Sequence, residues 1–151
     1  MRPTLYEAAG GQEGLLALAR AHHARCLADD NLNHPFSKED GHPQHLERLA
    51  AYWGEVLGGP TTYSETMLDE TSLERMHAGN GDMSEAARRF VDCFVGAIDD
   101  VGMPDDPAFR AAMRAYMEWA TGRFIAYPDD PTDVPEGLAV PRWGWDGLIR
   151  T

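Results

Sequence analysis

The apolar positions of this chain recur every three or four residues, which is the spacing of one face of an α-helix. Glycine pairs and glycine-proline runs interrupt that spacing and mark the ends of helices. We predict helices over residues 4–9, 12–28, 43–57, 84–101 and 107–127, with a short helical turn over 72–77. Strand signals are nearly absent, because no window alternates apolar and polar residues for more than a few positions. The pattern therefore predicts an all-α protein.

The last residues, 128–151, are rich in proline and lack helical periodicity. They carry Trp143 and Trp145 in an otherwise polar stretch. Large amphipathic rings in such a tail predict that it docks, either back on the body or on a partner. We therefore expect a helical domain over 1–127 and a C-terminal extension over 128–151.

Length and charge limit the kind of protein. A chain of 151 residues is the size of one domain with room for one ligand. Its formal net charge of -12 repels phosphate backbones and anionic lipid, so we expect neither nucleic acid nor membranes as partners. The N-terminus lacks the pattern of a signal peptide, and no apolar run is long enough to span a bilayer, so we expect a soluble cytoplasmic protein. Cys26 and Cys93 match no zinc spacing and are interpreted as small buried thiols in a reducing cytosol.

Histidine is the main chemical signal, because the sequence has no His-x-x-x-His pair, nucleophile elbow, phosphate loop or dinucleotide fingerprint. His77 ends a helical turn just before a glycine-rich break, where it could either cap the helix or bind a ligand. His45 begins the buried stripe of its helix, either as a satisfied core residue or as a functional one. His22 and His23 are adjacent and point about 100° apart, so at most one faces the middle of a pocket.

Several segments together resemble a truncated hemoglobin of group II. The opening, residues 5–11, is similar to the family's first helix and its glycine pair. The run Gly58-Gly59-Pro60, followed by Thr62-Tyr63-Ser64, resembles the end of helix E. Residues 73–78 resemble the segment that carries the proximal histidine, and Phe36 falls at the heme-packing aromatic after helix C. The resemblance extends over residues 4–127 and implies a two-over-two helical sandwich around a b-type heme.

The resemblance also implies roles for residues at the matching positions. His77 corresponds to the proximal iron ligand, and its second ring nitrogen would donate to a backbone carbonyl. His45 falls at the distal position on helix E and is a candidate sixth ligand, with Leu49 one turn later against the heme. His23 stands where helix B usually has a tyrosine. Phe90 stands where helix G usually has a tryptophan.

The remaining cofactor-binding candidates are Phe36, Tyr63 and Arg75. Met76 occupies a position where the family often has a basic residue, so Arg75 is our candidate for pairing with a propionate. The usual tyrosine and tryptophan donors are missing, and the imidazoles of His23 and His45 could replace them as hydrogen-bond donors. Either imidazole could also act as a general base toward peroxide.

Three hypotheses follow. The first is a heme protein that binds dioxygen, nitric oxide, carbon monoxide or another small ligand. The second is a heme enzyme with peroxidase-like, oxygenase or nitric-oxide-detoxifying activity, in which His45 and His23 are catalytic. Both would use an electron-donating reductase, and both are compatible with a homodimer. The third is a heme-free helical interaction domain, since a fold does not guarantee a bound cofactor.

Overall fold

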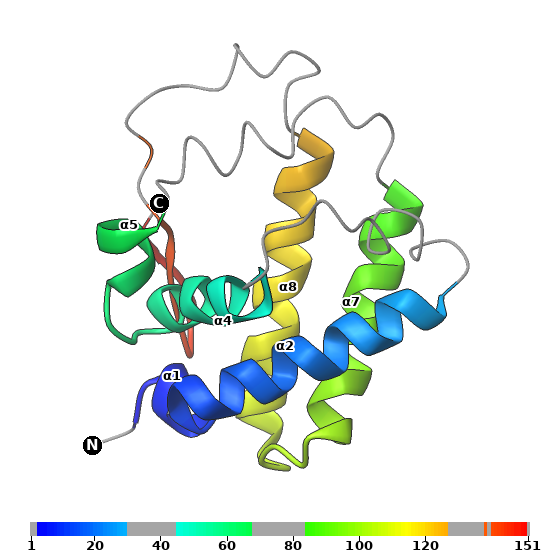
Figure 1. Ribbon diagram of the computed structural model, residues 1–151, viewed down its shortest axis with the longest axis horizontal. Helices are drawn as coiled ribbons and strands as arrows, with labels where there is room; N and C mark the ends of the chain where they lie inside the picture. Colours follow the sequence, from blue (N-terminus) through cyan, green and yellow to red (C-terminus); the bar gives the residue numbers. More distant parts are fainter. Residues whose placement is uncertain (1–2, 30–44, 68–83, 127–137, 139, 151) are drawn as a thin grey trace.

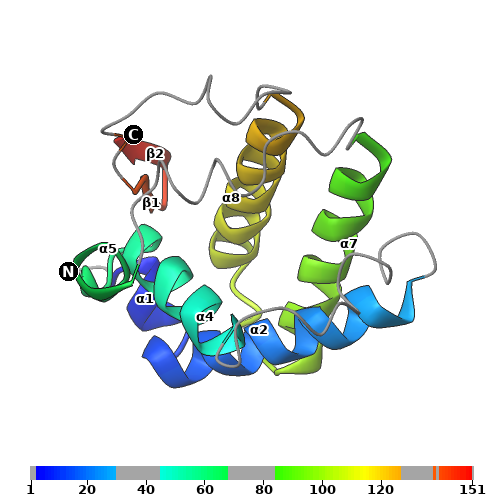
Figure 2. The ribbon, with the colours of Figure 1, turned by 45° about the horizontal axis from the view of Figure 1, so that its top comes forward.

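The computed structural model describes residues 3–29, 45–67, 84–126, 138 and 140–150. Two pairs of helices make up its body (Figure 1). In the first pair, α2 (Gly11–Ala28) packs against α4 (His45–Val56). In the second pair, α7 (Ser84–Asp100) packs against α8 (Pro107–Ala126). Because α2 also packs against α7, the two pairs share one core (Figure 2).

Helix ends lie close to where the apolar spacing predicts them. Each described end of α2, α7 and α8 falls within one residue of its predicted position. α1 (Leu5–Ala8) is likewise one residue shorter at each end than the predicted helix, because Thr4 serves as its N-cap and completes a capping box with Glu7. The predicted start of the third helix and the predicted turn over 72–77 lie outside the described residues.

The core lies where the helix faces meet. Its largest fully buried side chains come from α1, α2, α7 and α8 and from the end of α4. They are Leu5, Leu15, Leu18, His22, Leu57, Phe94, Ile98, Phe109, Met113, Tyr116 and Met117. All but one are apolar or aromatic groups whose removal from water drives folding. The exception is the imidazole of His22, which therefore needs hydrogen-bond partners inside the protein.

Two glycine corners bring α1, α2 and α4 together. Gly10 adopts a φ of 93°, in the left-handed region that favours glycine, at the sharp turn from α1 into α2. Gly59 lies so close to the ring of Tyr6 that a Cβ atom there would come within 2.6 Å of it. The amide of Tyr6 also donates to the carbonyl of Leu57 at 2.9 Å. Glycine at these corners thus permits close packing between the start of the chain and the end of α4.

A short helix, α5 (Thr62–Thr66), follows the second corner, where the sequence predicted a loop. Its start is held by Glu55, whose buried carboxylate accepts a hydrogen bond of 2.9 Å from the amide of Ser64. A side-chain acceptor for the free amides of a first turn is what short helices need. This acceptor comes from α4, so the local sequence of α5 gave no signal for it.

The C-terminal end contains a two-stranded antiparallel hairpin, and the prediction that strands are absent is wrong there. β1 (Arg142–Gly144) pairs with β2 (Gly147–Arg150), with Trp143 opposite Leu148. Strands of three and four residues are too short to show an alternating pattern, which explains why the sequence did not reveal them.

The hairpin docks on the helical body, one of the two outcomes expected for the tail. Trp143 is buried, and its Nε1 donates to the carbonyl of Ala112 on α8 at 3.2 Å. Trp145 donates to the carbonyl of Pro3 at 2.7 Å. Arg142 donates to the carbonyls of Glu55 and Gly59 at the end of α4. The tail therefore contacts the start of the chain, the end of α4, and α8.

Candidate functional site

The structure describes the side chains of four predicted site residues, which are His23, Leu49, Tyr63 and Phe90. For His45 it describes the backbone, as the first residue of α4. The predicted positions Phe36, Arg75 and His77 lie outside the described residues. The described candidate residues therefore lie on α2, α4, α5 and α7.

The apolar stripe of α4 is buried to different degrees along the helix. Ala50 and Trp53 are buried in the core, with exposed fractions of 0% and 3%. Leu46 and Leu49 are only half-buried, although they pack against the same core. A half-buried apolar surface on a helix is compatible with contact to a further apolar group.

α7 adds Phe90, which is half-buried and packs on His22 of α2. The ring centroids of Phe90 and His22 are 4.2 Å apart, and the two rings are nearly perpendicular. His22 in turn contacts Trp53 at 6.0 Å, one turn along α4 from Leu49. Leu49 and Phe90 therefore border the same cluster of core rings from two different helices.

His22 is a residue that the sequence analysis did not assign to the site. It is buried, and its Nε2 lies 3.2 Å from the backbone carbonyl of Phe90. Because a carbonyl only accepts, Nε2 carries the proton, which fixes the tautomer. Burial lowers the pKa of His22 to about 4, so the ring is neutral near pH 7. Its role is to join α2 to the α7 backbone behind Phe90.

The signal for His22 was present in the sequence. The buried positions of α2 include Leu15, Leu18, His22 and Cys26, which step by three and four residues. His23 falls beside this stripe and is half-buried. The resemblance drew attention to His23, whereas the spacing alone identifies His22 as the core histidine of the adjacent pair.

Tyr63 of α5 is buried and packs against α4. Its ring meets Tyr52 of α4 at a centroid distance of 5.1 Å in an edge-to-face arrangement. Such pairs favour a fixed ring orientation. Tyr52 lies one turn after Leu49, so Tyr63 supports α4 in its second half, beyond the predicted site residues.

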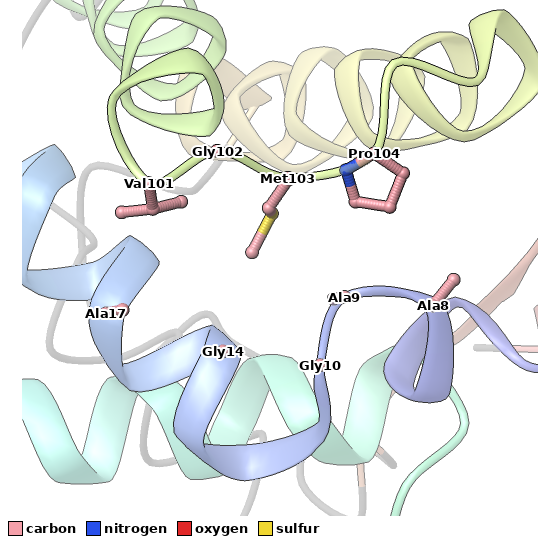
Figure 3. A pocket seen from close by; sticks show the side chains of 9 residues that line it. All are labelled: Ala8, Ala9, Gly10, Gly14, Ala17, Val101, Gly102, Met103 and Pro104. Carbon is pink, nitrogen blue, oxygen red and sulfur yellow. The ribbon is translucent and has the colours of Figure 1, made fainter.

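A separate hollow of about 220 Å³ lies between the α1–α2 corner and the α7–α8 turn (Figure 3). Small and apolar residues line it, among them Ala9, Gly14 and Met103. None of the predicted site residues belongs to this lining. The hollow thus lies apart from Leu49 and Phe90.

The described residues fit the apolar side of a flat macrocycle better than a multi-ligand metal site. Within the described ranges, no three histidine, cysteine or carboxylate side chains come together in a way that could hold a metal ion. A heme needs only one or two protein ligands to iron, and the rest of its contacts are apolar. Leu46, Leu49 and Phe90 are partly buried apolar side chains that would suit contacts of that kind.

Comparison with known families identifies the chain. The sequence model for bacterial-like globins matches residues 4–120, which is most of the protein.

The chain belongs to the bacterial-like globin family. A heme cofactor and the binding of diatomic ligands are what membership of this globin family implies. The match ends within α8, so the hairpin of this globin lies beyond the part that the family shares. No curated protein matches the chain significantly.

Solved structures of hemoglobins share the fold of this globin. A thermostable hemoglobin from the actinobacterium Thermobifida fusca is 30% identical, with a TM-score of 0.66, and the match covers 82% of this chain and 97% of that one. The group II truncated hemoglobin from Bacillus anthracis is 19% identical, with a TM-score of 0.71, and covers 86% and 96%. A truncated oxygen-avid hemoglobin from Bacillus subtilis is 21% identical, with a TM-score of 0.67, and covers 82% and 99%.

The predicted fold, a truncated globin built from two pairs of helices, is confirmed by these matches. The relatives are covered almost completely, whereas part of this chain remains unmatched, so this globin is longer than its relatives. Among the described residues, no helix is both long and apolar enough to cross a bilayer.

Proposed function

We propose that this globin binds a b-type heme through His77. We further propose that the iron binds a diatomic ligand, and that this ligand is dioxygen. The family match carries the proposal, because a globin fold is built around such a cofactor. The absence of a Cys-x-x-Cys-His motif supports type b, since Cys26 and Cys93 are the only cysteines and cannot attach a heme as in cytochromes c. The oxygen avidity of the similar protein from Bacillus subtilis supports the choice of ligand.

The described residues would form the ligand side of the pocket. A bound heme supplies an iron with a coordination position for a small ligand. Leu49 and Phe90 would pack against the macrocycle and exclude water from it. His22 holds Phe90 in place through the ring contact and the hydrogen bond to its backbone carbonyl.

The polar groups on that side would be imidazoles. His22 is committed to the carbonyl of Phe90 inside the core, so α2 offers His23 as its ligand-side residue. α4 begins with His45, at the end of the helix nearest to Leu49. An imidazole N–H donated to a diatomic ligand contributes about 0.5–1.5 kcal/mol, and more where the acceptor carries charge. We propose that His45 and His23 take the place of the missing tyrosine and tryptophan donors.

Heme content tests the proposal. Wild-type protein, His77→Ala and the control His42→Ala are expressed with heme supply and analysed as pyridine hemochromes. We expect about one heme b per chain for the wild type and for His42→Ala, which replaces a histidine outside the predicted site residues. We expect strongly reduced heme retention in His77→Ala. A wild-type protein without a Soret band would instead support a heme-free interaction domain.

Absorption spectra then separate the roles of His45. If His45 coordinates iron directly, the ferric and ferrous wild-type spectra are six-coordinate and become five-coordinate in His45→Ala. If it only donates to the ligand, coordination is unchanged and the dioxygen dissociation rate rises by roughly 2- to 13-fold, the equivalent of one hydrogen bond. Identical spectra and identical dissociation rates in the wild type and His45→Ala would show that His45 neither coordinates the iron nor contacts the ligand.

A further inference from the structure

The two cysteines of the chain are distant in sequence and adjacent in space. Cys26 lies on α2 and Cys93 on α7, and their side chains form a small buried cluster where the two helices cross. Both thiols are reduced in the structure, with exposed fractions of 0% and 9%. The sequence alone predicts two separate buried thiols, because only the packing of α2 on α7 brings them together.

The helices are held together on both sides of the thiol pair. On one side, Arg25 of α2 forms a bidentate ion pair with Asp100 of α7, with the shorter bond at 2.6 Å. On the other side, Asp29, the C-cap of α2, accepts from Arg89 of α7 at 3.2 Å. These contacts come from residues that flank Cys26 and Cys93 along their helices. The approach of the two thiols is therefore built into the packing rather than left to a flexible segment.

The two thiols have different chemical environments. Burial raises the pKa of both, and that of Cys26 rises strongly. The hydrogen bond from Cys26 and the positive charge of Arg25 partly offset the rise for Cys93, where they favour the thiolate. Cys93 is also the more exposed of the two. Cys93 is accordingly the sulfur that an oxidant would reach first, and Cys26 is the neighbour that would resolve it.

We propose that Cys26 and Cys93 are an oxidation site, at which a peroxide converts the thiol pair to a reversible intramolecular disulfide that locks α2 to α7. The Cys93 thiolate attacks one oxygen of hydrogen peroxide, the O–O bond breaks, and the released hydroxide takes a proton to become water. The Cys26 sulfur then displaces the hydroxyl from the Cys93 sulfenic acid, and a second water leaves with the Cys26 proton. Two thiols are oxidised and one peroxide is reduced to two waters.

The thiol pair lies one helical turn from His22 and Phe90, and Phe90 is a predicted site residue. Cys26 Sγ is 3.5 Å from Nε2 of His22, the atom that also bonds to Phe90. Phe90 itself packs against the cysteine cluster. A disulfide would fix the spacing of α2 and α7 next to this His22–Phe90 contact. The oxidation site does not depend on heme, so it stands or falls separately from the proposed function.

The test is mass spectrometry of the full-length protein after oxidation. Dilute protein is treated with hydrogen peroxide, or with diamide, which takes two electrons and two protons from a thiol pair without involving iron. We expect a monomer that is lighter by about 2 Da, a tryptic peptide pair that joins Cys26 to Cys93, and full reversal by dithiothreitol. The melting temperature should rise by roughly 5–15 °C, because the closed loop restricts the unfolded chain.

Single-thiol variants provide matched controls. Cys26→Ser and Cys93→Ser should show no loss of about 2 Da, and the Cys26→Ser protein should instead accumulate oxygen on Cys93. Disulfide-linked dimers of the wild type would overturn the proposal. So would sulfinic or sulfonic acids in place of the cross-link, or two free thiols in folded protein under conditions that oxidise the unfolded chain.

Discussion

In the helical body, side chains such as Leu18 and Phe94 are fully buried among apolar neighbours from several helices. The C-terminal hairpin is attached differently, through Arg142, Trp143 and Trp145, each of which donates to a backbone carbonyl of the body. Packing in the body is non-directional and repeats with the helix period, whereas the hairpin combines burial of the Trp143 ring with three specific donors. The body is also the part that matches the globin family, and the hairpin lies beyond that match.

This comparison shows how an addition can be joined to an established fold. The hairpin buries one large ring, Trp143, against Tyr116 and Trp119 of α8, at centroid distances of 5.9 and 5.5 Å. The carbonyls that accept these hydrogen bonds belong to Pro3 before α1, to Glu55 and Gly59 around the end of α4, and to Ala112 on α8. The following predictions test how far the stability of the two regions is coupled.

The largest effect is expected for Trp143→Ala. The change removes a buried ring together with the hydrogen bond that it donates to the carbonyl of Ala112, so we expect a loss of about 3–5 kcal/mol in the free energy of unfolding. Urea unfolding followed by circular dichroism measures it. A loss below about 1 kcal/mol would mean that the hairpin contributes little to the stability of the body.

The next effect concerns the body and its dependence on pH. Burial lowers the pKa of His22 from 6.5 to about 4, so the unfolded state takes up a proton in this range before the folded state does. The stability that comes from keeping His22 neutral is therefore complete above pH 6.5 and is lost as the pH falls toward 4. Between pH 7.5 and 4.5 we expect the wild type to lose about 2–3 kcal/mol more than His22→Leu. Parallel losses in the two proteins would contradict this origin.

A smaller effect is expected for Arg142→Met at the join between the two regions. The guanidinium satisfies the carbonyls of Glu55 and Gly59 at the end of α4, and its loss should cost about 1–3 kcal/mol. Urea unfolding gives the cost, and amide hydrogen exchange shows whether α4 and α5 open more readily. Arg142→Lys, which keeps a donor, should recover part of the stability. An equal loss in both variants would assign the effect to the fork of the guanidinium rather than to a single hydrogen bond.

The smallest effect is expected for Ile149→Ser on the outer face of the hairpin. This side chain is 71% exposed, so the free energy of unfolding should change by no more than about 0.5 kcal/mol. The same urea experiment serves. A larger loss would reveal that the outer face of the hairpin is covered in solution.

The sequence predicted the body well and the hairpin poorly, for the same physical reason. The helices at 12–28, 84–101 and 107–127 are long enough for a repeating apolar face to define them. β1 and β2 are too short for any period, and Arg142 makes its bonds to residues more than eighty positions away. The docking of the tail was foreseen only because two tryptophans stood out in a polar stretch.

For the candidate site, the sequence places Leu49 on α4 and Phe90 on α7. Trp53 of α4 and Phe90 both contact the ring of His22. The predicted positions Phe36, Arg75 and His77 lie outside the described residues, so their roles remain predictions. His22 was missed because its function is to position Phe90, and such support becomes visible only when α2 and α7 are packed together. The same packing reveals the Cys26–Cys93 pair.

The most direct test of the central claim is the iron–imidazole stretch in the resonance Raman spectrum of the ferrous protein. The spectrum is recorded directly after photolysis of bound carbon monoxide, which leaves the iron five-coordinate whether or not His45 is a sixth ligand. We predict that the band is present in the wild type, is lost in His77→Gly, and returns when free imidazole fills the space left by the side chain. A band that persists in His77→Gly without added imidazole would contradict the account, because another residue would then hold the iron.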